Sequence, residues 1–353
     1  MRLFRISRIK KIRFKSVFYI SLFWTLTDYI SIAYRDSFST LPPVKNLAVR
    51  EIIIFILSGI MGYIFVFKLK RIFRHYPLWL NFALKSLILI VGASIVIFLV
   101  HYLNSVLIEH RTAIAAFNRI KDFILFKDWM IQKLVYWMII FFITQLFITI
   151  NDKYAPGVFI DIVLGKYLNP RVEKRIVMFM DLKDSTPIAE KLENLPYFRF
   201  IREFIYLVST AIIEYEGQIY QYVGDEVVAS WNFTPENTRK SVEAIIHARK
   251  NIQKRSEYFR SLYGVIPEFR VGVHVGDVTV GEIGVLKKDL AMSGDTMNTT
   301  ARIRSACNEL NHNFIVSKDF MDNSDLKEWQ SEQLGIIELK GKRAEVELFS
   351  LKI

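Results

Sequence analysis

Four long apolar stretches dominate the first 150 residues and restrict what this part of the chain can fold into. They cover residues 16–34, 51–68, 79–100 and 130–150. About 20 apolar residues in a helix are enough to cross the hydrocarbon core of a bilayer. In lipid the backbone must satisfy its own hydrogen bonds, which favours helices. We therefore expect residues 1–150 to form an α-helical membrane domain with four spans, with three or five spans as alternatives.

Basic residues flank these stretches in a pattern typical of membrane topology. Residues 1–150 contain 20 Lys and Arg against 6 Asp and Glu, and much of this excess lies in residues 1–15 and 68–77. Such basic flanks stay on the cytoplasmic side of a membrane. Residues 1–34 lack the short apolar core and small-residue cleavage site of a signal peptide, so the first span is expected to be retained. The pattern predicts a multi-pass protein of the cell (inner or plasma) membrane with a cytoplasmic C-terminal domain.

The distribution of charge argues against nucleic acid as a partner. The net charge of +12 arises in the apolar N-terminal part, whereas a nucleic-acid-binding protein carries basic patches on its soluble part. The single cysteine, Cys307, excludes an intrachain disulfide and fits a reducing compartment. We expect contact with a lipid bilayer, no binding of nucleic acid, and a buried Cys307.

Asp28 lies near the middle of the first apolar stretch. An ionised side chain at that depth is costly unless it finds a partner inside the helix bundle. A packing role, with Lys85 as the candidate partner, and a role in sensing or binding a ligand remain alternatives.

Beyond residue 150 the pattern changes to alternating helices and strands. Residues 151–174 are expected to link the two parts, either as a segment that transmits motion or as a passive spacer. Residues 175–353 are expected to form one α+β domain with a mostly antiparallel sheet. The predicted elements are a strand to residue 181, helices over 186–215, a hairpin over 218–231, a helix over 235–259, a second hairpin over 269–284 that turns at Gly276 and Asp277, a helix over 296–307, and strands near 290, 314–316, 335–339 and 345–351.

Two aspartates each follow a β-rich run. Asp181 ends RIVMFMD, and Asp225 lies in the Gly-Asp turn of QIYQYVGDEVV, a typical hairpin. A strand, a helix and a hairpin can bring both carboxylates to one edge of a sheet. Carboxylates without nearby Cys or His favour Mg²⁺ or Mn²⁺, which also take waters and substrate phosphates as ligands.

A helix start follows directly after Asp181. Asp184, Ser185, Thr186 and Pro187 are expected to form this helix start, with a hydroxyl cap and Pro187 at the first helical position. The free backbone N–H groups of such a start can bind phosphate. Each of these features alone is common in ordinary structure, but together they indicate phosphoryl chemistry on a nucleotide.

Five ordered segments of the C-terminal part resemble the class III adenylate and guanylate cyclase catalytic domain. They are FMDLKDST, YQYVGDEVV, VGVHVGDVTVGEIG, GDTMNTTARI and ELKGKRAEVELF. The resemblance covers residues 171–353 and implies a ferredoxin-like sheet with flanking helices. VGDEV is also similar to the GGDEF signature of diguanylate cyclases, but that family is not expected to carry the two downstream segments.

The resemblance implies a role for each matching residue. Asp181, Asp225 and the backbone carbonyl of Leu182 would hold two Mg²⁺ or Mn²⁺ ions against a triphosphate. Asn298 and Arg302 would position the ribose and stabilise charge on the phosphates. These two residues are four apart, so they lie on one face of a helix. In this family the acids and the Asn-Arg pair come from different subunits, which implies a homodimer.

Other positions matter for binding the nucleotide. Lys340 matches a phosphate-binding lysine, whereas Gln221 and Ala291 stand where the family reads the base. Adenylate cyclases usually have Lys and Asp there and guanylate cyclases Glu and Cys, so the motif leaves the base undetermined. Asp184 and Ser185 also replace the Gly and Phe that are frequent in the phosphate loop.

The function we predict is that of a membrane-bound adenylate cyclase that converts ATP to 3′,5′-cyclic AMP and pyrophosphate. It rests on the frequency of ATP as the bacterial substrate of the family and on the lack of a guanine-specific acid at residues 221 and 291. A guanylate cyclase and a catalytically silent nucleotide-binding receptor are the alternatives.

Overall fold

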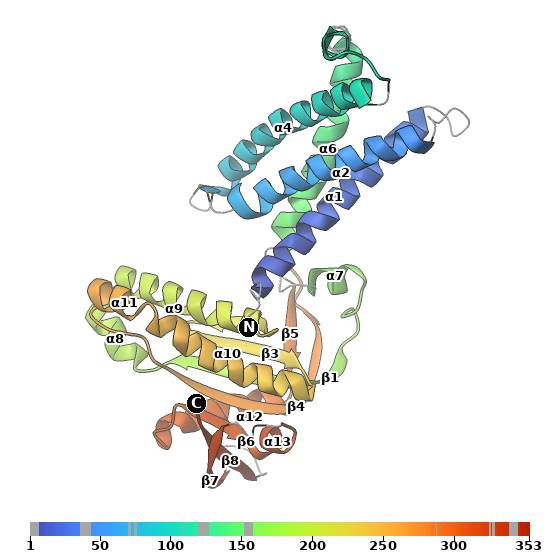
Figure 1. Cartoon of the computed structure of the whole chain (residues 1–353). Coiled ribbons are helices and arrows are strands. Elements are labelled where there is room, and N and C mark those ends of the chain that lie inside the picture. The colour runs from blue at the N-terminus through green and yellow to red at the C-terminus, as the bar shows by residue number, and fades with distance from the viewer. Residues whose placement is uncertain are drawn as a thin grey trace. The chain divides into compact units, whose positions relative to one another are not determined.

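The computed structural model describes residues 7–35, 44–69, 72–73, 76–107, 109–118, 127–151, 158–286, 288–324, 326, 329–338 and 345–353. The chain divides into two compact units, Met1–Lys153 and Tyr154–Ile353. Figure 1 shows helices in the first unit and a sheet with flanking helices in the second.

The N-terminal unit consists of long apolar helices: α1 (Arg8–Arg35), α2 (Val44–Tyr63) with the π-helix η1 (Ile64–Leu69), α4 (Leu78–Leu107) and α6 (Lys127–Asn151). Among the described residues, three segments are long and apolar enough to cross a membrane: Arg8–Ala33, Asn46–Leu69 and Trp79–Leu107. The apolar part of the fourth helix, Val135–Ile150, is shorter. The structure therefore provides three candidate spans, and the fourth predicted span is not confirmed.

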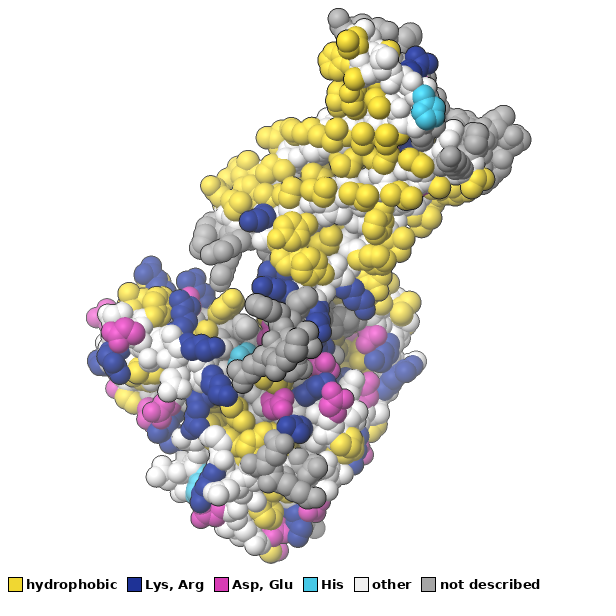
Figure 2. Space-filling model, viewed as in Figure 1, with side chains coloured by type: hydrophobic (Ala, Val, Ile, Leu, Met, Phe, Trp, Pro, Cys, Tyr) yellow, Lys and Arg dark blue, Asp and Glu magenta, His cyan; other side chains and the backbone are white. Residues whose placement is uncertain are grey.

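The surface of this unit differs from that of the C-terminal unit. Hydrophobic side chains form an almost continuous cover over the N-terminal helices, whereas Lys, Arg, Asp and Glu are spread over the C-terminal unit (Figure 2). Exposed apolar side chains on α1, α2, α4 and α6 are what a helix facing lipid requires.

Aromatic and hydroxyl side chains fasten the helices to one another. Trp24 of α1 packs on Trp137 of α6 with ring centroids 5.7 Å apart. The indole Nε1 of Trp24 donates to Oγ1 of Thr144 at 3.0 Å, and the Tyr136 hydroxyl donates to the Thr27 carbonyl at 2.6 Å. These contacts fix α1 against α6.

Asp28 lies inside the bundle, as its position in the sequence required. Its side chain is 3% exposed, and its Oδ2 lies 2.9 Å from Nη2 of Arg50 on α2. The sequence proposed Lys85 as the partner, and the structure corrects this to Arg50. Because Asp28 sits on α1 and Arg50 at the start of α2, one ion pair joins two helices next to each other in the chain.

The first prediction concerns this ion pair. Arg50→Ala should destabilise the N-terminal unit by about 3–5 kcal/mol, because it leaves the carboxylate of Asp28 buried without its charge partner. The double variant Asp28→Ala/Arg50→Ala should recover a large part of this loss. Denaturant unfolding of the full chain in detergent, followed by tryptophan fluorescence, measures both. A double variant as unstable as the single one would contradict the explanation.

The C-terminal unit is built on one mixed sheet with strand order β2-β3-β1-β4-β6-β8-β7, with β5 paired to β4. The strands are β1 (Arg171–Leu182), β2 (Gln218–Val223), β3 (Glu226–Asn232), β4 (Phe269–Ile283), β5 (Asp289–Ser293), β6 (Phe314–Ser317), β7 (Gln330–Glu338) and β8 (Glu345–Lys352). β4 and β6 pair parallel, and the other pairings found among the described strands are antiparallel. The mostly antiparallel α+β fold is as expected.

Helices cover both faces of this sheet: α7 (Val158–Val163), α8 (Ser185–Leu192), α9 (Asn194–Glu214), α10 (Pro235–Gln253), α11 (Ser256–Tyr263), α12 (Asp295–Glu309) and α13 (Lys318–Asp322). Helices α9 and α10 lie on one face (Figure 1), where Ile176, Met178 and Met180 of β1 are buried with apolar side chains of these helices. On the other, Ile303 and Cys307 of α12 pack on β6 and β8. Burial also raises the pKa of the Cys307 thiol to about 12, consistent with a buried apolar role.

The predicted second hairpin over 269–284 is wrong. These residues form the single strand β4, which pairs with β1 from Leu182↔Phe269 to Arg171↔Val280. Gly276 lies inside this ladder, and a Cβ there would meet Thr296 Oγ1 at 2.5 Å. The glycine therefore gives α12 room to approach, and the hairpin connection lies between β4 and β5 instead.

The helices expected over 186–215 are α8 and α9, which are separated at Glu193 with φ 59°. The single helix predicted over 235–259 is divided into α10 and α11. The first strand also begins at residue 171, inside the predicted linker.

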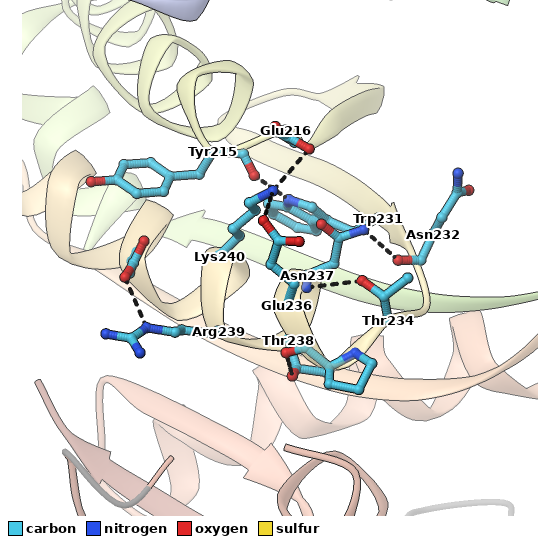
Figure 3. A network of polar contacts seen from close by, with 12 residues as sticks. Tyr215, Glu216, Trp231, Asn232, Thr234, Glu236, Asn237, Thr238, Arg239 and Lys240 are labelled. Atoms are coloured by element: carbon cyan, nitrogen blue, oxygen red, sulfur yellow. Dashed lines mark hydrogen bonds and ion pairs between the residues drawn. The ribbon is translucent and has the colours of Figure 1, made fainter. Parts of the chain in front are cut away.

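A polar network fastens α10 to the β2–β3 hairpin and to the end of α9 (Figure 3). Thr234 caps α10 by accepting from the Asn237 N–H at 3.1 Å. The Trp231 indole donates to the Tyr215 carbonyl at 2.8 Å. Lys240 lies 3.0 Å from Glu216. These contacts hold the hairpin that carries Asp225.

Candidate active site

The structure brings the two predicted acids together on the face of the sheet covered by α12. Asp181 is the penultimate residue of β1. Asp225 lies in the two-residue turn between β2 and β3, where Gly224 has φ 63°. β1 and β3 are neighbours, with Met180 opposite Val227. Burial raises the pKa of Asp181, and the nearby charge of Asp225 raises it further, while Arg304 and Arg270 act against the shift.

The surroundings of these acids fit a divalent cation. In the part of the chain that is described, Asp225 Oδ2 is buried without a hydrogen-bond partner. A buried carboxylate oxygen of this kind is costly unless a cation or donor reaches it. Leu182, the last residue of β1, follows Asp181 and is buried. Among the described residues, no group of three His, Cys, Asp or Glu side chains forms a complete metal cage. Mg²⁺ commonly binds through one or two carboxylates together with substrate phosphates.

Two further charged residues belong to the site and were not predicted. Arg304 of α12 places Nη1 3.3 Å from Asp181 Oδ2 and Nε 2.9 Å from Glu226 Oε2. The contact between Arg304 and Glu226 is an ion pair, but Arg304 Nε and Glu226 Oε2 are not aligned for a hydrogen bond. Burial raises the pKa of Glu226, with Arg304 opposing the shift. Glu226 lies within YQYVGDEVV and Arg304 directly follows GDTMNTTARI, but their pairing has no signal in the sequence because it depends on how α12 packs on the sheet.

The predicted phosphate-binding segment lies beside the acids, with a different cap from the one expected. Helix α8 begins at Ser185, and its N-cap is Asp184, which has φ 55° and makes no side-chain capping bond. Ser185 is half-buried and hydrogen-bonds to the Tyr197 hydroxyl, while Thr186 is exposed. Burial and the charge of Asp225 raise the pKa of Tyr197. This tyrosine of α9 therefore also reaches the acidic site.

Helix α12 is seated on β4 through two glycines. A Cβ at Gly272 would lie 2.4 Å from the backbone nitrogen of Arg304, and one at Gly276 would lie 2.5 Å from Thr296 Oγ1. This seat positions Asn298 and Arg302, the predicted catalytic pair. Asn298 is exposed and Arg302 half-buried, so neither side chain is sealed inside its own subunit.

The two residues predicted to contact the base lie on β2 and β5, and a tyrosine side chain of β2 forms a hydrogen bond to β5. Gln221 is exposed on β2, and Ala291 is half-buried on β5. Between them, the Tyr220 hydroxyl accepts from the Met292 N–H at 2.9 Å. Tyr220 was not predicted, although it neighbours Gln221 and falls at a register shift between β2 and β3. Lys340 lies outside the described residues.

Comparison with known proteins agrees with this geometry. Residues 169–352 match the adenylate and guanylate cyclase catalytic domain. The chain belongs to the adenylate and guanylate cyclase family. Adenylate cyclase 2 of Rhizobium meliloti is 28% identical over 204 residues, which cover 57% of this chain and 56% of the relative. An adenylate cyclase of Anabaena cylindrica is 23% identical over 214 residues, covering 57% and 42% of the two chains.

A solved structure of a bacterial light-regulated adenylyl cyclase shares the cyclase fold. The match has a TM-score of 0.54 at 19% identity and covers 64% of this chain and 66% of that one. This chain spans about half the length of the curated relatives it matches. Residues 169–352 are therefore a nucleotide cyclase catalytic domain with a mixed sheet and flanking helices.

The second prediction tests the seat of α12. Gly272→Ala should cost about 1–3 kcal/mol of stability, because the added methyl group meets the backbone of Arg304 and the helix must move. Gly276→Ala is the comparison variant, because there the methyl group meets the Thr296 side chain, whose hydrogen bond to the Asp277 carbonyl would be disturbed, but not the helix backbone. Unfolding midpoints and nucleotide cyclase rates of both variants should show the larger loss for Gly272→Ala. Equal tolerance of the two substitutions would contradict this account.

Proposed function

We propose that this protein is a membrane-bound adenylate cyclase that forms 3′,5′-cyclic AMP and pyrophosphate from ATP. The observation that carries the proposal is the meeting of Asp181 and Asp225 at one site beneath the helix with Asn298 and Arg302. The candidate spans support attachment to the cell membrane. A cytoplasmic catalytic domain follows if the shorter apolar helix Val135–Ile150 crosses as a fourth span, because the basic flank keeps the N-terminus in the cytoplasm and four crossings return the chain there.

The reaction forms one bond and breaks another at the α-phosphorus. The ribose 3′-oxygen attacks it, the bond to the β-phosphate oxygen breaks, and pyrophosphate leaves while the 3′-proton passes to solvent. Two Mg²⁺ or Mn²⁺ ions, when bound, lower the pKa of the attacking hydroxyl and neutralise the leaving phosphates. Asp181, Asp225 and the Leu182 carbonyl would hold these ions.

Other residues of the chain bind and orient the nucleotide. The start of α8, with Ser185 and Thr186, would hold phosphate oxygens through its backbone N–H groups. Lys340 would add a positive charge to the phosphates. Gln221 and Ala291 would contact the purine, where the amide of Gln221 can donate or accept. The names of the two curated relatives, both adenylate cyclases, favour ATP over GTP.

The geometry of α12 supports a homodimer. Arg302 and Arg304 are two positions apart, so their side chains leave the helix about 200° apart. Arg304 faces Asp181 of its own chain, and Arg302, with Asn298 on its side of the helix, therefore points away from that site. The pair would instead complete the site of a second copy, giving two equivalent sites per dimer.

The third prediction tests the reaction. Membranes that contain the full chain, incubated with Mn²⁺ and either ATP or GTP, should form cyclic AMP from ATP. Asp225→Asn keeps the side-chain shape but removes the charge, and should reduce the rate about 100-fold or more. Cyclic GMP alone would reassign the substrate to GTP. No product from either nucleotide would favour the silent receptor.

The fourth prediction tests the shared site. Asp225→Asn and Arg302→Ala should each be inactive alone, because each removes a different half of every site. Coexpressed in equal amounts, they should recover roughly a quarter of wild-type activity, since half of the dimers are mixed and each of these has one intact site. Two Asp225→Asn copies with different tags provide the control. No recovery in mixed dimers isolated through two tags would argue against sites shared between subunits.

A further inference from the structure

Arg304 brings a positive charge into the acidic site, and the reaction described above gives it no role. Its Nη1 lies 3.3 Å from Asp181 Oδ2, and its Nε lies 2.9 Å from Glu226 Oε2. The side chain is 24% exposed, so solvent screens it only in part. Arg304 thus contacts Asp181, which is predicted to bind a metal ion, and Glu226, which is not.

The helix backbone holds the guanidinium at this place. Gly272 abuts the nitrogen, Cα and Cβ of Arg304, with a Cβ at 272 only 2.4 Å from that nitrogen. The neighbouring Ile303 and, one turn on, Cys307 are fully buried against the sheet. Helix α12 therefore cannot rotate to remove Arg304, and the positive charge can change place only by moving its own side chain.

A divalent ion and this guanidinium would use the same oxygen. Mg²⁺ binds carboxylate oxygens at about 2.1 Å, which is closer than the 3.3 Å between Nη1 and Asp181 Oδ2. The two positive charges would also repel each other. When the guanidinium is displaced from Asp181, it can remain paired with the carboxylate of Glu226. Because Nε of Arg304 and Oε2 of Glu226 do not form a well-aligned hydrogen bond, the guanidinium can change its orientation.

We propose that Arg304 competes with the divalent ion for Asp181 Oδ2 and so sets the metal concentration at which the site fills. The inference rests on the metal site of the proposed function. Arg304 is a positioning residue here, because it acts on the ion through Asp181 and contacts no substrate in the proposed reaction. An enzyme of this kind would respond to changes in free divalent ion rather than remain saturated.

The experiment measures Mn²⁺ binding without nucleotide. Full-length wild type and Arg304→Gln, both in detergent, are titrated with Mn²⁺, and free Mn²⁺ is followed by electron paramagnetic resonance. Binding lost in Asp225→Asn identifies the site. Arg304→Gln should bind Mn²⁺ about tenfold more tightly, because a nearby positive charge is removed. Unchanged or weaker binding, with an unaltered unfolding midpoint, would overturn the proposal.

Two variants separate competition from other effects. Arg304→Lys keeps the charge and should bind Mn²⁺ close to wild type, and binding as tight as in Arg304→Gln would contradict competition through charge. Arg260→Gln removes an exposed charge on α11 and should leave the affinity unchanged. If Arg304→Gln instead fails to fold, Arg304→Met takes its place, because it also removes the charge and keeps the aliphatic part of the side chain: it should bind Mn²⁺ more tightly than Arg304→Lys, and equal affinity of the two would overturn the proposal.

The Mn²⁺ titration and the cyclase assay can succeed or fail separately. Tighter Mn²⁺ binding by Arg304→Gln without any cyclic nucleotide would support the role of Arg304 and reject the proposed function. Cyclic AMP formation with unchanged Mn²⁺ affinity would do the reverse.

Discussion

The close approach of α12 to β4 is the contact on which the catalytic unit depends. Gly272 and Gly276 are four residues apart on one strand, so both lie on the same face of the sheet. Neither has a side chain to hold the helix away, and the backbone of Arg304 rests directly on Gly272. One face of α12 thus reaches the acids of its own chain, while Asn298 and Arg302 remain accessible on another.

The buried carboxyl groups of the acidic site can bind a positive charge, but their burial lowers the stability of the fold when they are ionised. Burial raises the pKa of Asp181 and Glu226, so the folded protein favours their neutral forms more than the unfolded chain does. Their contribution to stability is therefore present at low pH and is lost as pH rises through these raised pKa values. Arg304 and Arg270 reduce this cost. Function and stability make opposite demands on the same carboxylates.

The sequence predicted features that depend on neighbouring residues and missed those that depend on distant ones. The Gly224–Asp225 turn was correct because turn chemistry is local. Gly276–Asp277 has the same two residues but lies inside a strand, because it pairs with β1 and packs against Thr296, which are both distant in sequence. Asp28 was expected to be paired, yet its partner proved to be Arg50 instead of Lys85. The fold class followed from five ordered motifs, whereas the Arg304–Glu226 pair has no local signal.

The spacing along α12 links the two proposals physically. Residues 302 and 304 leave the helix on opposite sides, so one rigid element carries a cation towards its own acids and, in the proposed dimer, another towards the second subunit. The seat on β4 prevents rotation of the helix, and so displacement of Arg304 by a metal ion must be taken up by its side chain. Filling of the metal site can therefore proceed without moving Arg302 away from the partner. Weak metal binding and correct positioning of the second subunit's residues are then compatible within one enzyme.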